Sequence, residues 1–174
     1  MRQNMKLSNV AAGFVNGVIV AGMVAIGFAG AKEAQAESRL ATVTDKDRYC
    51  LQQNIYFEAR NQSTIGQVAV AWVTMNRVEA KRYPNTVCGV VWQNKQFSWT
   101  HDGKSDKPGK SSLEKRAWED AGIVAQVVLL DWAREKSSPV KDATMYHADY
   151  VSPYWRTAYD LVVTIDNHIF YKEG

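Results

Sequence analysis

The stretch Asn54-Ile55-Tyr56-Phe57-Glu58-Ala59-Arg60 decides how the chain folds and where its chemistry lies. Leu51 and Ile55 are four residues apart, and Glu58 follows three residues later, so these side chains share one face of a predicted helix. A carboxyl group on a buried face keeps its proton to higher pH than a free one, and a general acid needs that state near neutrality. The alternative is a structural glutamate paired with Arg60 or another cation.

Three pairs of residues, each a hydroxyl side chain followed three positions later by a polar one, predict where helices begin. They are Thr44 with Asp47, Thr64 with Gln67, and Ser111 with Glu114. The first helix is expected over residues 45–60 and the third over residues 112–135. The second starts near residue 64 and ends before Pro84, because the residue preceding a proline is steered out of the helical region.

Shorter apolar segments follow the second and third helices. Residues 87–92 are rich in β-branched side chains, which fits either a strand or an irregular loop. Residues 144–147, 161–165 and 168–171 predict strands, and Asp166-Asn167 between the last two is a two-residue hairpin signal. Helices first and a small antiparallel sheet near the C-terminus predict an α+β domain. We assign residues 44–174 to this one domain.

Composition limits the kind of partner. The chain has 174 residues, 46% of them hydrophobic and 22% charged, with a formal net charge of +3. Removing residues 1–36 takes away three basic residues and one acidic residue, which leaves 18 basic and 17 acidic residues. A nearly neutral domain is a poor partner for nucleic acid, because phosphate binding needs clustered Lys and Arg. We therefore expect no nucleic-acid partner, and a monomer.

The N-terminus is typical of an export signal. Arg2 and Lys6 precede an uncharged run over residues 7–31, and residues 34–36 (Ala-Gln-Ala) offer a small-x-small cleavage site. Because the run is longer than an ordinary signal core, residues 1–36 are either a signal peptide or a signal anchor that holds the protein transiently in the inner membrane. Residues 37–43 are expected to be a flexible lead-in. Periplasm or cell envelope is the expected location.

The two cysteines, Cys50 and Cys88, lie in the part that would be exported. In an oxidising compartment an even pair favours a disulfide, which would join the helix of Glu58 to residues 87–92. Two buried thiols are the alternative.

Seven segments, in order, resemble the SleB/CwlJ-type cell-wall hydrolase family, named for spore cortex-lytic enzymes. They are residues 50–60, 66–71, 76–77, 84–91, 96–99, 143–155 and 167–171. The resemblance implies a peptidoglycan-degrading enzyme with a lysozyme-like or transglycosylase-like helical domain. It also implies that Glu58 is the catalytic acid/base. Many members continue the Glu58 motif as Glu-Ala-Arg-Gly-Glu, whereas this chain has Asn61-Gln62.

The missing second acid bears on the mechanism. Ordinary glycosidases use two carboxyl groups, one as acid and one as nucleophile or base. A lytic transglycosylase cleaves the bond between N-acetylmuramic acid and N-acetylglucosamine with one. We therefore favour a transglycosylase, in an endolysin or wall-remodelling role, over a muramidase, for which Glu79, Asp102 or Asp149 would supply the second carboxylate.

A cleft for sugars needs flat rings that stack on pyranose faces and polar groups that bind hydroxyls and acetamides. Core packing is the alternative for each ring, above all for Trp155 and Phe97. The candidates for substrate binding are Gln96, Phe97, Ser98, Trp99, Tyr146, His147, Tyr154, Trp155 and Tyr171.

Two other functions stay open. His101, His147 and His168 suggest a zinc-dependent amidase, but they lack the short spacings of metal motifs, so we expect no metal and no cofactor. His147 is instead expected to form a hydrogen bond near Glu58 and orient substrate, and His168 to be structural. A wall-binding module without activity would keep the aromatic residues but has no need of Glu58.

Overall fold

The computed structural model describes residues 18–173, with side chains from Gly30 onward. The chain divides into two compact units, residues 1–34 and residues 35–174. In the first, residues 18–34 form the start of helix α1, Val18–Ala41. Arg2, Lys6 and the first part of the predicted export signal lie outside the described residues. No helix of the described part combines the length and the apolar character needed to cross a membrane.

Helix α2, Asp45–Ala59, is the helix predicted around the decisive stretch. The Thr44 side chain accepts a hydrogen bond from the backbone N–H of Asp47, and the Asp47 carboxylate accepts one from the backbone N–H of Thr44. This capping box satisfies donors that the first turn of a helix leaves unpaired. Leu51, Ile55 and Tyr56 are buried, so the predicted apolar face is confirmed.

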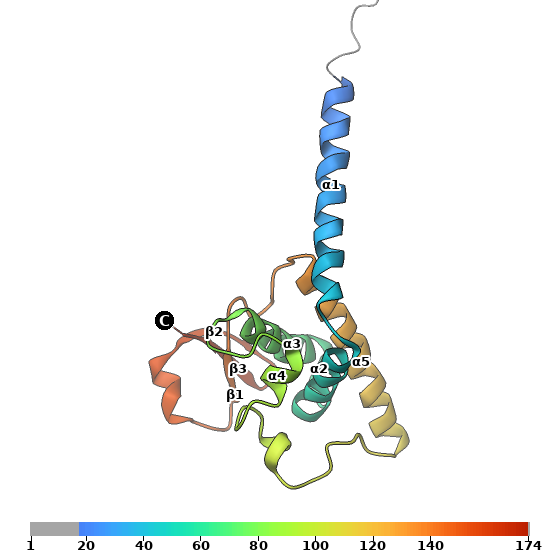
Figure 1. Cartoon of the computed structure of the whole chain (residues 1–174). Coiled ribbons are helices and arrows are strands. Elements are labelled where there is room, and N and C mark those ends of the chain that lie inside the picture. The colour runs from blue at the N-terminus through green and yellow to red at the C-terminus, as the bar shows by residue number, and fades with distance from the viewer. Residues whose placement is uncertain (1–17, 174) are drawn as a thin grey trace, which may run out of the picture. The chain divides into compact units, whose positions relative to one another are not determined.

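Two more long helices pack with α2 (Figure 1). Helix α3 spans Thr64–Glu79, and its N-cap is Ser63, one residue before the predicted cap. Helix α5 spans Ser112–Ala133 and begins with the predicted capping box of Ser111 and Glu114. It ends two residues earlier than predicted, because the chain turns into the left-handed region at Glu135, where φ is 55°.

Residues 87–92 form neither a strand nor a loop, contrary to the sequence prediction. They make a short helix, α4, Val87–Val91, in which the Thr86 side chain accepts from the backbone N–H of Gly89. The Asp47 carboxylate accepts from the backbone N–H of Cys88 at 2.9 Å. Cys88 is joined to Cys50 of α2 by a disulfide. These tertiary contacts override the weak β preference of a five-residue apolar run.

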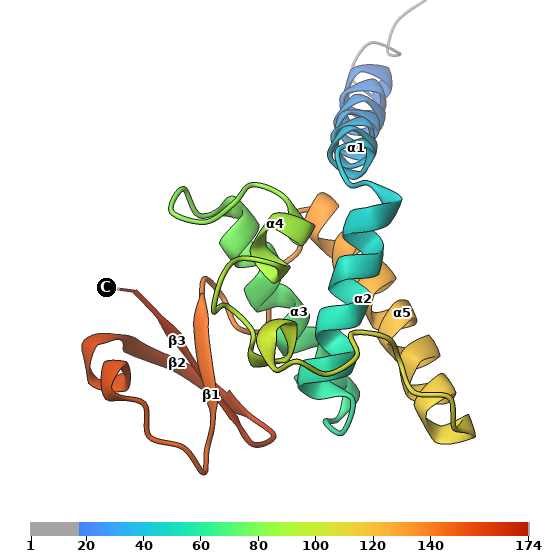
Figure 2. The same cartoon turned by 60° about the horizontal axis from the view of Figure 1, so that its bottom comes forward.

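The sheet contains β1 (Met145–Ala148), β2 (Asp160–Ile165) and β3 (His168–Lys172), within a residue or two of the predicted strands. All pairs are antiparallel in the order β1-β3-β2, with Tyr146 opposite Phe170. Asp166 has a φ of 50° in the predicted two-residue turn. Two short 3₁₀ helices, η1 (Ser98–His101) and η2 (Tyr154–Ala158), complete this unit. The sheet lies beside the helices (Figure 2). The predicted α+β class is confirmed.

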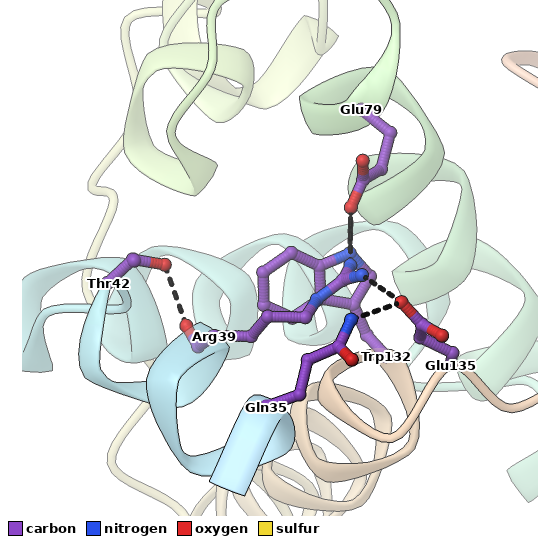
Figure 3. Close-up of polar contacts among 6 residues, drawn as sticks. All are labelled: Gln35, Arg39, Thr42, Glu79, Trp132 and Glu135. Carbon is purple, nitrogen blue, oxygen red and sulfur yellow. Dashed lines mark hydrogen bonds and ion pairs between the residues drawn. The ribbon is translucent and has the colours of Figure 1, made fainter. Parts of the chain in front are cut away.

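The end of α1 is not a flexible lead-in. Residues 35–41 are helical and pack on the domain, where Ala36 is buried. The Arg39 guanidinium lies 4.2 Å from the ring centre of Trp132 in α5 and forms ion pairs with Glu79 (2.6 Å) and Glu135 (3.2 Å). Figure 3 shows the guanidinium over the Trp132 ring with both carboxylates beside it. Spacing in the sequence gave no sign of these contacts, which join Arg39 to residues 40 to 96 positions away.

Replacing Arg39 with alanine is therefore expected to lower the free energy of unfolding by about 1–2 kcal/mol, through loss of one cation–π contact and two partly exposed ion pairs. Denaturant unfolding measures this. Arg48→Ala is the matched control, because Arg48 has only a 3.8 Å ion pair with the fully exposed Asp45. If both variants lose the same small amount, the end of α1 contributes nothing to the fold.

Candidate active site

Glu58 lies in the last turn of α2, half-buried, and its carboxylate has a direct partner in the sheet. The Tyr146 hydroxyl donates a hydrogen bond to Glu58 Oε2 at 2.8 Å. The two residues are 88 positions apart, and β1 brings Tyr146 to the end of α2. The predicted carboxylate on a buried helix face is thus held in one orientation by a group on another element.

Burial raises the pKa of Glu58 above its ordinary value. The hydrogen bond from Tyr146 and the positive charge of Arg77 act in the opposite direction and only partly offset the desolvation. A carboxyl group in this environment keeps its proton to higher pH, which is the requirement for a general acid. The same hydroxyl and guanidinium stabilise the carboxylate once the proton has left.

The side chain of Tyr146 is held in place by two neighbouring rings. Its ring packs against Phe170 (ring centres 5.6 Å apart) and edge-on against His168 (5.3 Å). Burial, with the neighbouring Glu58 carboxylate, raises the pKa of Tyr146 well above its usual range. The phenol therefore stays protonated and serves as a hydrogen-bond donor to Glu58.

Arg77 of α3 is a second fixed group at the site, buried to 3% exposure. Its Nε donates to the backbone carbonyl of Thr144 at 2.7 Å, at the start of β1. With its amide oriented to satisfy both partners, Gln96 Oε1 accepts from Nη1 of Arg77 at 3.0 Å. The guanidinium also lies 5.2 Å from the ring centre of Phe97. Arg77 thus ties α3, β1 and the segment before η1 together behind Glu58.

Glu58 lines two clefts. The larger, with a volume of about 460 Å³, lies toward β1 and η2, and the smaller, about 300 Å³, lies toward η1 and the loop at residues 102–105. Phe57, Glu58 and Ser98 line both. Both volumes are in the range of small-molecule sites, roughly 300–1,000 Å³. A chain-like substrate can therefore occupy both clefts with Glu58 at the junction.

The structure brings most of the predicted substrate-binding residues to these clefts. Trp99 lines the smaller cleft, where its ring stacks on Phe57 with centres 4.7 Å apart. Tyr171 is buried and Tyr154 is 94% exposed, and neither lines a cleft beside Glu58. Those that line the larger cleft are Gln96, Phe97, Ser98, Tyr146, His147 and Trp155.

His147, which was expected to form a hydrogen bond near Glu58 and orient substrate, lines the larger cleft together with Glu58, and its ring nitrogens bond to groups other than the Glu58 carboxylate. Its Nδ1 lies 2.8 Å from the carbonyl oxygen of Ala148, and its Nε2 lies 3.1 Å from the Tyr171 hydroxyl. Because a carbonyl only accepts, Nδ1 carries a proton. The hydrogen bond to Glu58 itself comes from the neighbouring Tyr146, which was predicted as a substrate-binding residue.

Of the three carboxylates considered as a second acid or base, only Asp102 lines a cleft with Glu58. Its side chain accepts from the backbone N–H of Lys104 and lies 3.9 Å from the Lys104 amine. Glu79 accepts hydrogen bonds from Arg39 and Trp132 instead. Asp149 is exposed and lines neither cleft.

Within the described part of the chain, no three His, Cys, Asp or Glu side chains come together in a group that could hold a metal ion. His101 lies in η1, whereas His147 and His168 belong to β1 and β3. His168 is buried and lines the larger cleft.

Several residues that line the clefts were not predicted from the sequence, among them Phe57, Arg77, Lys95 and Tyr150. Phe57 and Arg77 belong to segments on which the family resemblance rests, so that resemblance was a usable signal. Tyr150 is 80% exposed at the cleft edge. Lys95 is in the left-handed backbone region, with a φ of 61°, and no pattern in the sequence marks it.

Proteins with similar sequences include spore cortex-lytic enzymes. The sequence profile of the Cell Wall Hydrolase family matches residues 61–171, well over half of the chain, starting three residues after Glu58. A spore cortex-lytic enzyme of Bacillus cereus is 44% identical over 50 residues, which are 29% of this chain and 19% of that protein. One from Bacillus subtilis (strain 168) is 34% identical over 73 residues, 42% of this chain and 24% of that protein. The chain thus matches about a fifth to a quarter of these relatives.

Two solved structures resemble the fold. The catalytic domain of the Bacillus cereus SleB protein superposes with a TM-score of 0.52 and 28% identity, covering 75% of this chain and 95% of that domain. The catalytic domain of the germination-specific lytic transglycosylase SleB from Bacillus anthracis gives a TM-score of 0.55 and 28% identity, covering 74% and 96%. The similarity thus extends over nearly the whole of each catalytic domain.

Proposed function

The chain belongs to the cell wall hydrolase family, and we propose that it is a lytic transglycosylase that cleaves peptidoglycan glycan strands with Glu58 as acid and base. The observation that carries this proposal is the position of Glu58: a half-buried carboxyl group, oriented by Tyr146, at the junction of two clefts. A glycan strand that runs through both clefts presents one glycosidic bond to Glu58.

In the first step Glu58, protonated, donates its proton to the glycosidic oxygen between N-acetylmuramic acid and N-acetylglucosamine. The bond to C1 breaks, the leaving sugar departs as an alcohol, and positive charge develops on the C1 side of the muramic acid ring. Glu58 is left as a carboxylate. The Tyr146 hydroxyl and the Arg77 charge stabilise that carboxylate, because both favour the ionised form.

In the second step the Glu58 carboxylate accepts the proton of the C6 hydroxyl of the same muramic acid. The C6 oxygen forms a bond to C1, which closes a 1,6-anhydro ring and restores the acid. No water is consumed and no second carboxylate is needed. This fits the described part of the chain, in which Glu58 is the one carboxyl-bearing residue that lines both clefts.

A hydrolytic muramidase is the second candidate, because Asp102 lines the smaller cleft with Glu58. Asp102 would then act on a water molecule as the base. Its carboxylate already accepts a hydrogen bond from the backbone N–H of Lys104 and lies 3.9 Å from the Lys104 amine, so part of its hydrogen-bonding capacity is in use and not free to bind a water molecule.

The product ends distinguish these reactions. Mass spectrometry of soluble products from purified Gram-negative sacculi is expected to find chains that end in 1,6-anhydro-muramic acid. Reducing ends would establish a muramidase, and free peptides with intact glycan would establish an amidase, which a chelator should inhibit. A wall-binding module would release no product and would stay bound to the sacculus.

The Tyr146→Phe variant tests whether the Tyr146 hydroxyl lowers the pKa of Glu58. Loss of a hydrogen bond that lowers the pKa of Glu58 should raise that pKa further, so the alkaline limb of the pH–rate profile should move to higher pH. The rate should also fall, roughly tenfold, because the carboxylate loses a charge-assisted bond that orients it. Tyr171→Phe is the control, since its hydroxyl bonds to His147 and should not move the limb. A shift toward lower pH in Tyr146→Phe would contradict this role.

An enzyme acting on peptidoglycan works outside the cytoplasm. The uncharged N-terminal run, whether cleaved or retained as a transient inner-membrane anchor, would export the protein. The disulfide between Cys50 and Cys88 fits an oxidising compartment. We place the protein in the periplasm or cell envelope, as a monomer that serves as an endolysin or in wall remodelling.

A further inference from the structure

The charges around the two clefts are unequal. Glu58 and Asp102 are the acidic residues that line them, and Lys104 lies 3.9 Å from Asp102. The basic residues that line them are Arg77 and Lys95 in the larger cleft, and Arg60 and Lys104 in the smaller. Arg77 is buried and engaged by Thr144 and Gln96. Two exposed cations remain, Lys95 on one side of Glu58 and Arg60 on the other.

Neither Lys95 nor Arg60 has a carboxylate partner among residues 30–173. Arg60 lies over the Tyr56 ring at 5.0 Å and donates a long hydrogen bond, 3.5 Å, to the Tyr56 carbonyl. These contacts hold the side chain at the cleft and leave most guanidinium donors available. Arginine matches a carboxylate with two parallel hydrogen bonds, whereas lysine acts as a point charge. Each cleft therefore has a cation suited to an anionic ligand.

The backbone at Lys95 adds a second observation. Its φ of 61° is in the left-handed region, which is unfavourable for a lysine and is usually occupied by glycine or asparagine. The Lys95 side chain, attached to this unfavourable backbone conformation, lines the larger cleft together with Glu58.

We propose that Lys95 and Arg60 bind carboxylates of the peptide stems of peptidoglycan, one on each side of the cleaved bond. This inference rests on the proposed function and specifies its substrate. Peptidoglycan differs from other β-linked aminosugar polymers in its muramic acid residues, whose lactyl groups carry short peptides with free carboxylates. The enzyme then prefers peptide-bearing strands to bare glycan of the same length.

The test compares kcat/KM on two substrates: peptide-bearing glycan strands, and the same strands stripped of peptide by an amidase. The wild-type protein is expected to prefer the peptide-bearing strands. In Lys95→Asn, whose side chain is neutral and suits the left-handed backbone, the ratio of the two values should fall about threefold to fivefold. Arg60→Gln should lower it similarly. Lys95→Arg should keep most of the preference.

Lys107→Asn is the matched control, because Lys107 is exposed and lines neither cleft. The ratio of the two kcat/KM values for this variant should equal that of the wild type. Added salt should also reduce the wild-type preference, since exposed ion pairs are screened. Equal cleavage of both substrates by the wild type would overturn the inference and leave the proposed function standing. A Lys95→Asn variant that loses activity equally on both would also overturn it. No glycan cleavage at all would overturn the proposed function itself.

Discussion

Replacing Glu58 with glutamine is expected to lower the rate of glycan cleavage by about a thousandfold or more. Glutamine keeps the size and the hydrogen bond to Tyr146 but has no proton to give to the glycosidic oxygen and cannot accept one from the C6 hydroxyl. General acid–base catalysis contributes roughly 10²–10⁴-fold, and here one group would serve both steps. Release of soluble muropeptides from sacculi measures the rate.

The control for this variant is Glu119→Gln, an exposed glutamate on α5, which should behave as the wild type. Asp102→Asn should also retain most activity if the reaction is a transglycosylation. If Glu58→Gln keeps a tenth or more of the wild-type rate, Glu58 is not the acid. If Asp102→Asn loses as much activity as Glu58→Gln, the enzyme is a two-carboxylate hydrolase.

Loss of activity in Glu58→Gln should not come from unfolding. Because the pKa of Glu58 is raised in the folded state, the protonated form favours folding, and this contribution is lost as the pH rises through the raised pKa. Glutamine removes the penalty for burying a charge. The variant should therefore melt about 2 °C above the wild type at neutral pH. The difference should shrink as the pH falls below the ordinary pKa of a glutamate.

Removing the disulfide has the second large expected effect. Replacing both Cys50 and Cys88 with serine should lower the free energy of unfolding by about 4 kcal/mol, because a cross-link between residues 38 positions apart restricts the unfolded chain. Domains of this size are stable by only about 5–15 kcal/mol. Denaturant unfolding under oxidising conditions measures the difference.

A reducing agent supplies the control for this prediction. It should destabilise the wild type by a similar amount and leave the double-serine variant as it was. The disulfide joins α2, the helix that carries Glu58, to α4. Its removal should therefore lower the stability of the whole domain and leave the pH–rate profile unchanged. Equal stability with and without reductant would mean that the bridge contributes nothing.

Local signals in the sequence were enough to place the three long helices and the sheet. Thr44 with Asp47 and Ser111 with Glu114 form the capping boxes that their spacing predicted. Asp166-Asn167 is the turn that the hairpin signal predicted. Each of these signals depends on residues within a few positions of one another, which is why they could be found without a fold. The resemblance to cell-wall hydrolases is also confirmed.

Apart from the disulfide between Cys50 and Cys88, which the pair of cysteines favoured, contacts between distant segments could not be predicted. Residues 87–92 were expected to form a strand or a loop, but they form helix α4. Its capping by Thr86 and its hydrogen bond to Asp47 outweigh the β preference of valine. The lead-in was expected to be flexible, because nothing in residues 37–43 indicates that Arg39 meets Trp132. Within the candidate site, Glu58 was named from its helix face, whereas its hydrogen-bond partner Tyr146, 88 positions away, was predicted only as a substrate-binding residue.

Digestion in water labelled with heavy oxygen is the most direct test of whether Glu58 carries out a transglycosylation. Sacculi are digested in the labelled water, and the mass of each new muramic acid end is determined. A transglycosylase takes the C1 oxygen from the sugar's own C6 hydroxyl, so we predict 1,6-anhydro ends without label. Labelled reducing ends would mean that water attacks C1, and would contradict a single-carboxylate mechanism at Glu58.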